Sequence, residues 1–313
     1  MTSWPATVCA VLAIAAGTAG CGLGAGDEQG GDGATLRVTR DFGHELLESA
    51  EVDALRESDT VMRLLRAQAG DVETAYGGRF VSSIGGLAME GGGEPRDWFY
   101  WVNGVEASIG AGEYELSPGD VVQWDHRRWA AAMRVPAIVG AYPEPLLHGL
   151  EGKRLPVRVE CADPRGRACA TAKERLGEAG VTATGSALGS PASGEVIRVV
   201  VAPWQRAREL ASIQAIEEGP AESGVFARFE DRGRELLLLG ADGEPVRPAP
   251  AGSGLVAAIS FAEAKSVWVV TGVDEAGVLA ASAALDEEVL RDAFAVAVLP
   301  AGAQKLPLVE GGG

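Results

Sequence analysis

The segment from Asp97 to Ala107 limits what this chain can fold into more than any other segment. Its residues 98–102 are aromatic or β-branched, and Asn103-Gly104 follows them directly. Asn-Gly is the strongest short hairpin signal, because both central residues of a type I′ turn need a positive φ. The segment therefore predicts a strand that ends in a tight hairpin.

Further strands and one helix are expected around this hairpin. Leu36 and Val38 alternate with polar neighbours, which is typical of a half-buried strand. The spacing of apolar residues predicts a helix within 51–69, which Ser58 or Asp59 can cap. Its apolar residues are Val61, Leu64 and Leu65. Strand patterns cover residues 76–81, 82–87, 114–116 and 121–124.

Four sequence motifs follow one another in this part of the chain. They are TVMRLL at 60–65, VSSIGG at 81–86, WFYWVNG at 98–104 and GAGEYELSPGDVVQW at 110–124. Taken in this order, they closely resemble the transcobalamin-like C-terminal domain family. That family is similar to the smaller β-domain of transcobalamin and intrinsic factor, which closes over one face of cobalamin. The resemblance covers about a third of the chain and implies a small β-grasp-like α+β domain at residues 34–130.

The aromatic strand is the candidate binding element. Successive side chains of a strand point to opposite faces, so Trp98, Tyr100 and Val102 share one face while Phe99 and Trp101 share the other. Aromatic rings suit a flat corrin ring, and the alternative is that they pack the domain's own core. The predicted ligand-binding residues are Trp98, Tyr100, Trp101, Asn103, Tyr114 and Trp124. His126 is expected to face solvent. The alternatives are that it donates a hydrogen bond to a ligand or that it coordinates a metal ion.

The N-terminus carries the features of an export signal. An apolar run at 8–16 is too short to span a bilayer as a helix, and small residues precede Cys21 as in a lipobox. Thr18, where Leu is usual, and the absence of Lys or Arg before the run depart from that pattern. We expect a lipoprotein signal peptide over 1–21, with palmitate or a similar acyl chain on Cys21, and a Gly-rich tether over 22–33. An uncleaved, buried N-terminal helix is the alternative.

Two further cysteines lie close together in the second half of the chain. Cys161 and Cys169 flank a Pro-Arg-Gly turn that can bring their sulfur atoms together. A disulfide over so short a loop would contribute about 2–3 kcal/mol in an oxidising compartment, on the chain-entropy model. Two buried free thiols are the alternative, and a zinc site lacks a third Cys or a nearby His.

The second half reads as a separate domain at 153–313, joined by an apolar, Pro-containing connector at 131–152. Strands alternating with helices predict an α/β sandwich with a mixed sheet. Trp204 and Trp268 are candidate ligand contacts, although core packing is the first expectation for both. The expected strands cover 155–160, 196–202, 225–229, 235–239, 266–272 and 293–299. The expected helices cover 168–179, 204–216 and 274–285.

Charge and composition argue against two classes of function. A net charge of −17 without a basic stripe opposes binding to nucleic acid. The three histidines, His44, His126 and His148, form no catalytic or metal-binding set in the sequence. The turn at 270–274 lacks a phosphate-loop pattern. We therefore expect no enzyme activity, no metal site and no required cofactor.

These inferences favour a binding protein anchored outside the cytoplasm. The resemblance implies capture of cobalamin or another corrinoid between the two domains, for transfer to a vitamin importer. The alternative is a cell-surface protein–protein interaction module without a small-molecule ligand. The two hypotheses differ in whether the aromatic face is open or is buried against residues after 130.

Overall fold

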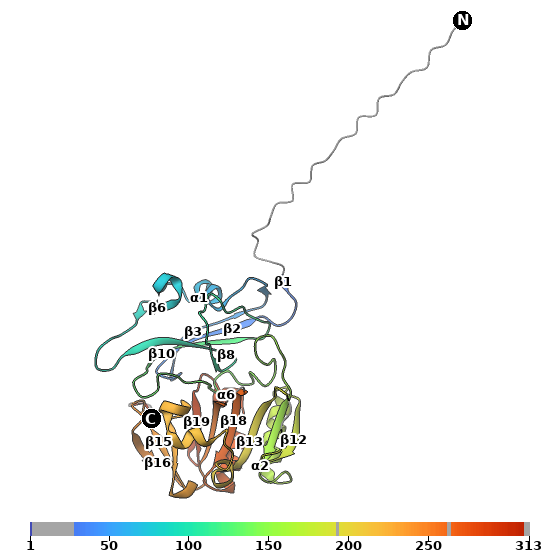
Figure 1. Ribbon diagram of the computed structural model, residues 1–313, viewed down its shortest axis with the longest axis vertical. Coiled ribbons are helices and arrows are strands. Elements are labelled where there is room, and N and C mark those ends of the chain that lie inside the picture. Colours follow the sequence, from blue (N-terminus) through green and yellow to red (C-terminus); the bar gives the residue numbers. More distant parts are fainter. Residues whose placement is uncertain (2–27, 192–193, 262–263, 310–313) are drawn as a thin grey trace.

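The computed structural model describes residue 1 and residues 28–191, 194–261 and 264–309. The protein is mixed α+β, with more residues in strands (39%) than in helices (19%). Figure 1 shows two sheet-containing halves, one on top of the other, with the N-terminal half at the end that carries β1 (Glu28–Gln29). The leader, the expected lipidation of Cys21 and the first part of the tether lie outside the described residues.

Five strands form the main sheet of the N-terminal half: β2 (Ala34–Arg40), β3 (Glu45–Val52), β8 (Arg96–Val102), β9 (Val105–Glu106) and β10 (Val121–Arg128). Their order is β3-β2-β10-β8-β9. β2 and β10 run parallel at the centre, and the other neighbours are antiparallel. β8 and β9 are the two strands of the Asn-Gly hairpin, in which Asn103 and Gly104 both have positive φ (52° and 73°). The predicted hairpin is therefore confirmed.

One helix, α1 (Val61–Gln68), packs on this sheet. The hydroxyl of Thr60 caps it by accepting a hydrogen bond from the Arg63 amide (3.3 Å). Asp59 caps a tighter turn instead, where its carboxylate accepts from the Arg56 amide (2.8 Å). The prediction of a helix from residue 51 is wrong at its start, because residues 45–52 form β3 and pair with β2.

Two small sheets complete the N-terminal half. In one, β1 pairs with β4 (Leu55–Arg56), and the other contains β5 (Val72–Ala75), β6 (Phe80–Ile84) and β7 (Leu87–Ala88), with a 3-10 turn, η1 (Tyr76–Gly78), between β5 and β6. The strand expected at 114–116 is wrong. Only one bridge joins Glu115 to Thr60, because the backbone here bonds to the start of α1, with the Val61 amide donating to the Tyr114 carbonyl (3.0 Å).

Seven strands form the main sheet of the C-terminal half: β11 (Val157–Cys161), β12 (Ala183–Ala187), β13 (Ile197–Pro203), β17 (Gly254–Phe261), β18 (Ala264–Gly272), β19 (Ala295–Leu299) and β20 (Gly302–Leu306). Their order is β12-β11-β13-β18-β17-β19-β20. The first four strands in this order run parallel to one another, and the remaining pairings, beginning with β18–β17, are antiparallel. The prediction of a mixed sheet is confirmed, although β12, β17 and β20 were not among the expected strands.

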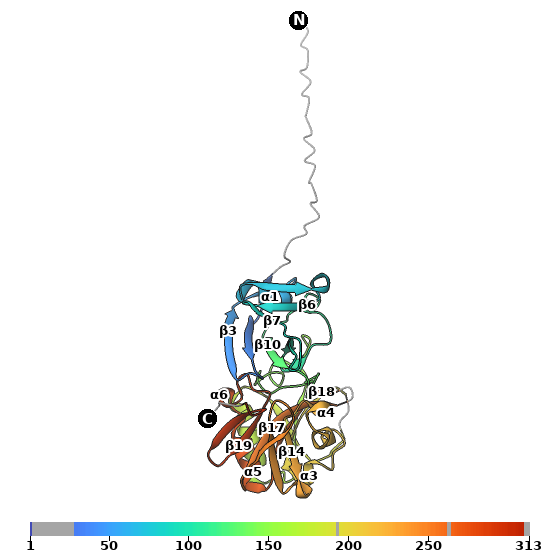
Figure 2. The ribbon, with the colours of Figure 1, turned by 90° about the vertical axis from the view of Figure 1, so that its left-hand side faces the viewer.

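Apolar residues cover both faces of this sheet. One face packs on α2 (Arg167–Glu178) and α5 (Glu275–Ala283), near the short helix α6 (Glu287–Leu290). The other face packs on a small sheet of β14 (Ala227–Glu230), β15 (Glu235–Leu239) and β16 (Pro245–Pro248) and on short helical turns: α3 (Trp204–Ala207), η2 (Gln214–Glu218), α4 (Pro220–Ser223) and η3 (Asp231–Gly233). Figure 2 shows this arrangement from the side.

The single helix expected at 204–216 is wrong. α3 ends at Ala207, and the chain turns back before η2. This bend lets Trp204, Ile213 and Ile216 enter the same apolar cluster. Trp204 and Trp268 are both fully buried, as the core reading predicted.

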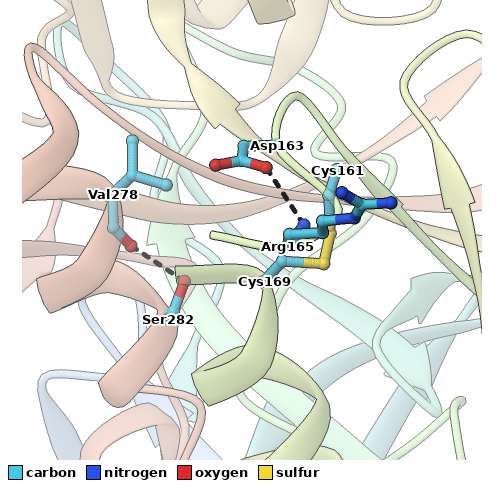
Figure 3. The surroundings of a disulfide bond; sticks show 6 residues. All are labelled: Cys161, Asp163, Arg165, Cys169, Val278 and Ser282. Atoms are coloured by element: carbon cyan, nitrogen blue, oxygen red, sulfur yellow. Dashed lines mark hydrogen bonds between the residues drawn. A yellow bond between two sulfur atoms is a disulfide. The ribbon is translucent and has the colours of Figure 1, made fainter. Parts of the chain in front are cut away.

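A disulfide joins Cys161 at the end of β11 to Cys169 in the first turn of α2 (Figure 3). The intervening turn is held by Asp163, whose carboxylate accepts a hydrogen bond from the Arg165 amide (3.0 Å). Of the two readings left open by the sequence, the structure has the disulfide. It links strand to helix within the C-terminal half.

The turn between β2 and β3 fastens the two halves together. Phe42 and Gly43 both have positive φ (60° and 75°), a conformation that is uncommon for Phe. It places the Phe42 ring in the C-terminal half, edge-on to Phe226 (5.0 Å) and Phe294 (5.2 Å). Asp125 holds the turn by accepting hydrogen bonds from the Phe42 and Gly43 amides (3.0 and 2.9 Å). The two halves therefore share one apolar cluster.

Candidate functional site

Strand β8 sends its aromatic side chains to opposite faces of the N-terminal sheet. Trp98, Tyr100 and Val102 lie in the apolar cluster beneath α1. Phe99 and Trp101 lie in the cluster shared with the C-terminal half. The predicted alternation is therefore confirmed. We call the first surface the helix-side face and the second the interdomain face.

On the helix-side face the rings pack against one another. Trp98 is 7% exposed, and its Nε1 donates to the Leu87 carbonyl (3.0 Å). Tyr100 stacks on Trp124 with 4.8 Å between ring centroids, and its hydroxyl donates to the Ile109 carbonyl (2.6 Å). Burial raises the pKa of the Tyr100 phenol well above its usual range. These three side chains act as part of the core in this structure.

On the interdomain face, Trp101 is fully buried. Its Nε1 donates to the Val135 carbonyl (2.7 Å), and its ring lies edge-on to Phe294 (5.0 Å). The guanidinium of Arg127 lies 3.9 Å from the centre of the Phe99 ring. The two hypotheses differ in whether the aromatic face is open or is buried against residues after 130, and the structure has the buried arrangement.

Asn103 fixes the hairpin turn. Its side-chain amide donates to the Asp120 carboxylate (2.8 Å) and to the Gly149 carbonyl (3.0 Å), and its oxygen accepts from the Val121 amide (2.8 Å). Burial raises the pKa of Asp120 to about 6. Asn103 is only 1% exposed, and both its amide nitrogen and its oxygen are hydrogen-bonded within the protein.

His126 is buried, and the expectation that it faces solvent is wrong. Its Nε2 lies 3.1 Å from the Ala88 carbonyl, and its ring lies 5.1 Å from the Trp98 ring. Burial lowers the pKa of His126. The position follows from β10 being central, because a histidine on the helix-side face of a central strand is covered by neighbouring elements.

A pocket of about 260 Å³ lies where the two halves and the connector meet. Tyr114 is the one predicted ligand-binding residue that lines it. The walls come from the β8–β9 hairpin and the loop after it, from the connector and from β17. The lining residues are Val102, Val105, Glu106, Ala107, Ser108, Ile109, Tyr114, Arg134, Pro136, Leu150, Glu151 and Ser260.

The polar groups of the pocket are mainly acidic and phenolic. Glu106 is 9% exposed at its side chain and accepts from Nε of Arg134 (3.0 Å), which is 65% exposed. Burial raises the pKa of Glu106, and the nearby Arg134 partly opposes this. Burial also raises the pKa of Tyr114, with Asp120 and Glu151 adding to the effect. Such walls suit a ligand with an apolar body and groups that donate hydrogen bonds.

Sequence reasoning missed the Glu106–Arg134 pair. The residues are 28 positions apart, one at the end of a hairpin and the other in the connector. They meet because the connector adds to the edge of the hairpin, where the Glu106 amide donates to the Pro136 carbonyl (3.0 Å). No spacing pattern signals such pairing between a strand edge and an irregular segment.

The described residues offer neither a metal site nor a membrane-spanning helix. Within residues 28–191, 194–261 and 264–309, no group of three or more His, Cys, Asp or Glu side chains could hold a metal ion. In the same described part of the chain, none of the helices combines the length and the apolar character needed to cross a bilayer.

Part of the chain is similar to a known family of proteins. A family model described as a domain of unknown function, DUF4430, matches residues 58–128. DUF4430 is a transcobalamin-associated family, and the matched residues contain all four motifs. No curated protein matches the chain.

Proposed function

We propose that this protein is a membrane-anchored, extracytoplasmic binding protein that holds a small ligand in the pocket between its halves. The pocket itself carries the proposal. It is lined by both halves and the connector, has apolar walls, and contains the buried Glu106 together with the phenol of Tyr114. Sites with these properties at domain boundaries are the usual location of small-molecule binding. We propose no catalytic role.

The extracytoplasmic location is supported by two features. The lipobox-like residues before Cys21 provide a site for lipidation, and the disulfide between Cys161 and Cys169 is typical of proteins from oxidising compartments. We propose that the acyl chain on Cys21 holds the protein at the outer surface of the cell membrane.

A corrinoid is the first ligand to test. The match of residues 58–128 to a transcobalamin-associated family favours it. The sheet order β3-β2-β10-β8-β9, with β2 and β10 parallel and α1 across one face, supports a β-grasp-like fold for this half, and the layers of the other half support an α/β sandwich. A pocket of about 260 Å³ is smaller than the common range of roughly 300–1,000 Å³ for ligand sites, so a whole corrinoid requires the halves to separate. Such a protein would deliver its ligand to an importer.

Retention of cyanocobalamin tests this ligand directly. The purified protein is incubated with cyanocobalamin and desalted, and bound corrinoid is measured by its absorbance. Ser108→Trp fills the pocket from an exposed position, and Ala170→Trp on α2 is the matched exposed control. Retention of about one cyanocobalamin per chain by the wild-type protein and by Ala170→Trp, but not by Ser108→Trp, supports corrinoid binding at the pocket. Retention that survives Ser108→Trp places the corrinoid elsewhere.

If no corrinoid is retained, the small-ligand proposal has a separate test. The protein is extracted from its own membranes and examined by native mass spectrometry for a bound small molecule. A ligand present on the wild-type protein and on Ala170→Trp, and absent from Ser108→Trp, supports the pocket. If no small molecule is bound, the interaction-module hypothesis takes precedence, because it explains a buried aromatic face without a ligand.

Anchoring is tested independently of any ligand. The full chain is expressed in a bacterium fed with a labelled fatty acid, and membranes are separated from soluble material. We expect the wild-type chain to be labelled and recovered with membranes, and Cys21→Ala to be unlabelled. Equal labelling of both chains would contradict lipidation at Cys21.

A further inference from the structure

The loop between β5 and β6 exposes two aromatic rings. Tyr76 is 81% exposed and Phe80 is 61% exposed, and their rings contact each other edge-on with 5.8 Å between centroids. Single exposed apolar residues are common on protein surfaces, whereas neighbouring exposed rings in contact form a small apolar patch. We call residues 76–80 the aromatic loop.

The backbone of the aromatic loop is built to hold this exposure. Tyr76, Gly77 and Gly78 have consecutive positive φ values of 52°, 75° and 91°. The left-handed conformation is unfavourable for Tyr, and residues held in such conformations often lie at functional sites. The flanking strands β5 and β6 pair antiparallel and fix both ends of the loop.

The charge of the aromatic loop differs from that of the rest of the protein. Arg79 is the only charged residue between Thr74 and Ser83, in a chain whose net charge is −17. Arg79 is exposed and has no ion pair with another residue of the described ranges. Aromatic rings that flank a cation match the interface of a bilayer, where rings lie at the level of the headgroups and arginine binds phosphate.

The aromatic loop lies at the end of the molecule where the described chain begins. In Figures 1 and 2 the elements α1 and β6 lie at the end far from the C-terminal half, and the chain enters at the same end. β1 pairs there with β4, which directly precedes α1 along the chain. The seven residue steps from Cys21 to Glu28 span at most about 25 Å. A lipid on Cys21 would therefore keep this end close to the bilayer.

We propose that the aromatic loop docks into the headgroup region of the bilayer that carries the Cys21 anchor. Tyr76 and Phe80 enter the interface, and Arg79 pairs with lipid phosphate. The anchor and the loop together give two points of attachment, which hold the C-terminal half away from the membrane. This proposal rests on the proposed lipid anchor and is independent of the ligand.

A fluorescent label at the loop tests the docking on the acylated protein. Phe80→Cys adds one free thiol to a mature chain whose other cysteines are acylated or joined in the disulfide. The thiol is labelled with an environment-sensitive dye, and the protein is reconstituted into vesicles of phosphatidylethanolamine and phosphatidylglycerol. Val246→Cys, at a 58% exposed position of β16 in the C-terminal half, is the matched control. We expect nitroxide-labelled lipids to quench the dye at position 80 at least threefold more than at position 246.

The outcomes separate the anchor from the loop. Protein that does not float with the vesicles shows that the anchor has failed, and the unacylated chain from residue 22 then tests the loop alone. We expect Tyr76→Ser with Phe80→Ser to lower the vesicle affinity of that chain about tenfold or more, and Val246→Ser to leave it unchanged. Floating protein with equal, weak quenching at positions 80 and 246 overturns the proposal. A change in the fluorescence of the dye at position 80 that occurs only when membrane proteins are added also overturns the proposal. The aromatic loop would then bind a protein and not the lipid headgroups.

Discussion

The two faces of the N-terminal sheet come from the same strands but differ in composition. The helix-side face is apolar apart from His126, and its fully or nearly fully buried residues include Leu36, Val38, Trp98, Val102, Val122 and Trp124. The interdomain face is equally buried and yet mixes aromatic, polar and charged residues: Thr39, Trp101, Gln123, Asp125 and Arg127. An apolar face needs only something apolar to cover it, whereas a buried polar face needs specific hydrogen-bonding partners.

Those partners come largely from beyond residue 130. Gln123 donates from Nε2 to the Asp292 carbonyl (2.9 Å), and Arg127 donates to the carbonyls of Ala132 (2.7 Å) and Met133 (3.0 Å). A buried polar group that loses its partner costs about 1–3 kcal/mol. The helix-side face is therefore covered by the N-terminal half alone, while the interdomain face makes the two halves depend on each other.

The strongest test of this dependence is Trp101→Ala. The substitution removes a fully buried ring that contacts both the connector and the C-terminal half. We expect the free energy of unfolding to fall by about 3–5 kcal/mol, as for other buried large-to-Ala changes. Denaturant unfolding followed by tryptophan fluorescence and circular dichroism measures it. Phe80→Ala, at an exposed position, is the control, and a loss below about 1 kcal/mol at position 101 would show that the halves pack loosely.

The next largest effect is expected at Asp125. Asp125→Ala leaves the Phe42 and Gly43 amides without their acceptor and frees the turn that joins the halves. We expect a loss of about 2–4 kcal/mol in unfolding free energy. The Phe42 and Gly43 amides bond to different carboxylate oxygens, so Asp125→Asn keeps an acceptor for one of them and is expected to lose less stability than Asp125→Ala. Equal losses in the two variants would mean that the turn does not depend on these hydrogen bonds.

The same contrast explains what the sequence could predict. The helix-side face follows simple rules: the alternation along β8, the spacing of Val61, Leu64 and Leu65 and the Asn-Gly turn all gave the observed elements. These features depend on residues close together in the chain. The disulfide belongs to the same class, because its two cysteines flank one turn.

The interdomain face could not be predicted in this way. The strand was expected to end at Trp124, whereas β10 continues to Arg128, because no local pattern shows that residues after 130 will cover its polar side chains. For the same reason Trp101 appeared available for a ligand and His126 appeared exposed, although both are buried. The pocket residues Glu106 and Arg134 were missed because an irregular connector brings them together.

The ion pair between Arg37 and Asp292 tests the polar coupling of the halves directly. Nη2 of Arg37 donates to Asp292 Oδ2 (2.6 Å), and a second hydrogen bond joins Nε to the other carboxylate oxygen. The side chains are only 15% and 7% exposed. A double-mutant cycle of Arg37→Ala and Asp292→Ala is expected to give a coupling energy of about 1–2 kcal/mol. A coupling near zero would show that packing alone holds the halves together.

The smallest expected effect concerns pH and the buried carboxylate of Asp125. Burial raises its pKa from the ordinary value of 3.8 to about 6. The folded protein therefore binds this proton more tightly than the unfolded chain does. The stabilisation that comes from protonated Asp125 is fully present below pH 3.8 and is lost as the pH rises through 6. His44 and His126 act in the opposite direction, because burial lowers their pKa and stability falls when the pH drops through 6.5.

Because the two histidines act in the opposite direction, the pH dependence of the wild-type unfolding free energy does not by itself report on Asp125. The difference in unfolding free energy between the wild-type protein and Asp125→Asn is therefore measured. Only the wild-type protein can lose the Asp125 contribution, so its unfolding free energy relative to the variant should fall by about 1 kcal/mol between pH 5.5 and 7.5. Denaturant unfolding at the two pH values measures this, with the exposed Glu57→Gln as the control that should show no change. A constant difference would mean that Asp125 remains ionised throughout this range. The nearby Arg127 guanidinium would then outweigh the effect of burial on the pKa of Asp125, and the interdomain face would hold a true ion pair rather than a neutral carboxyl group.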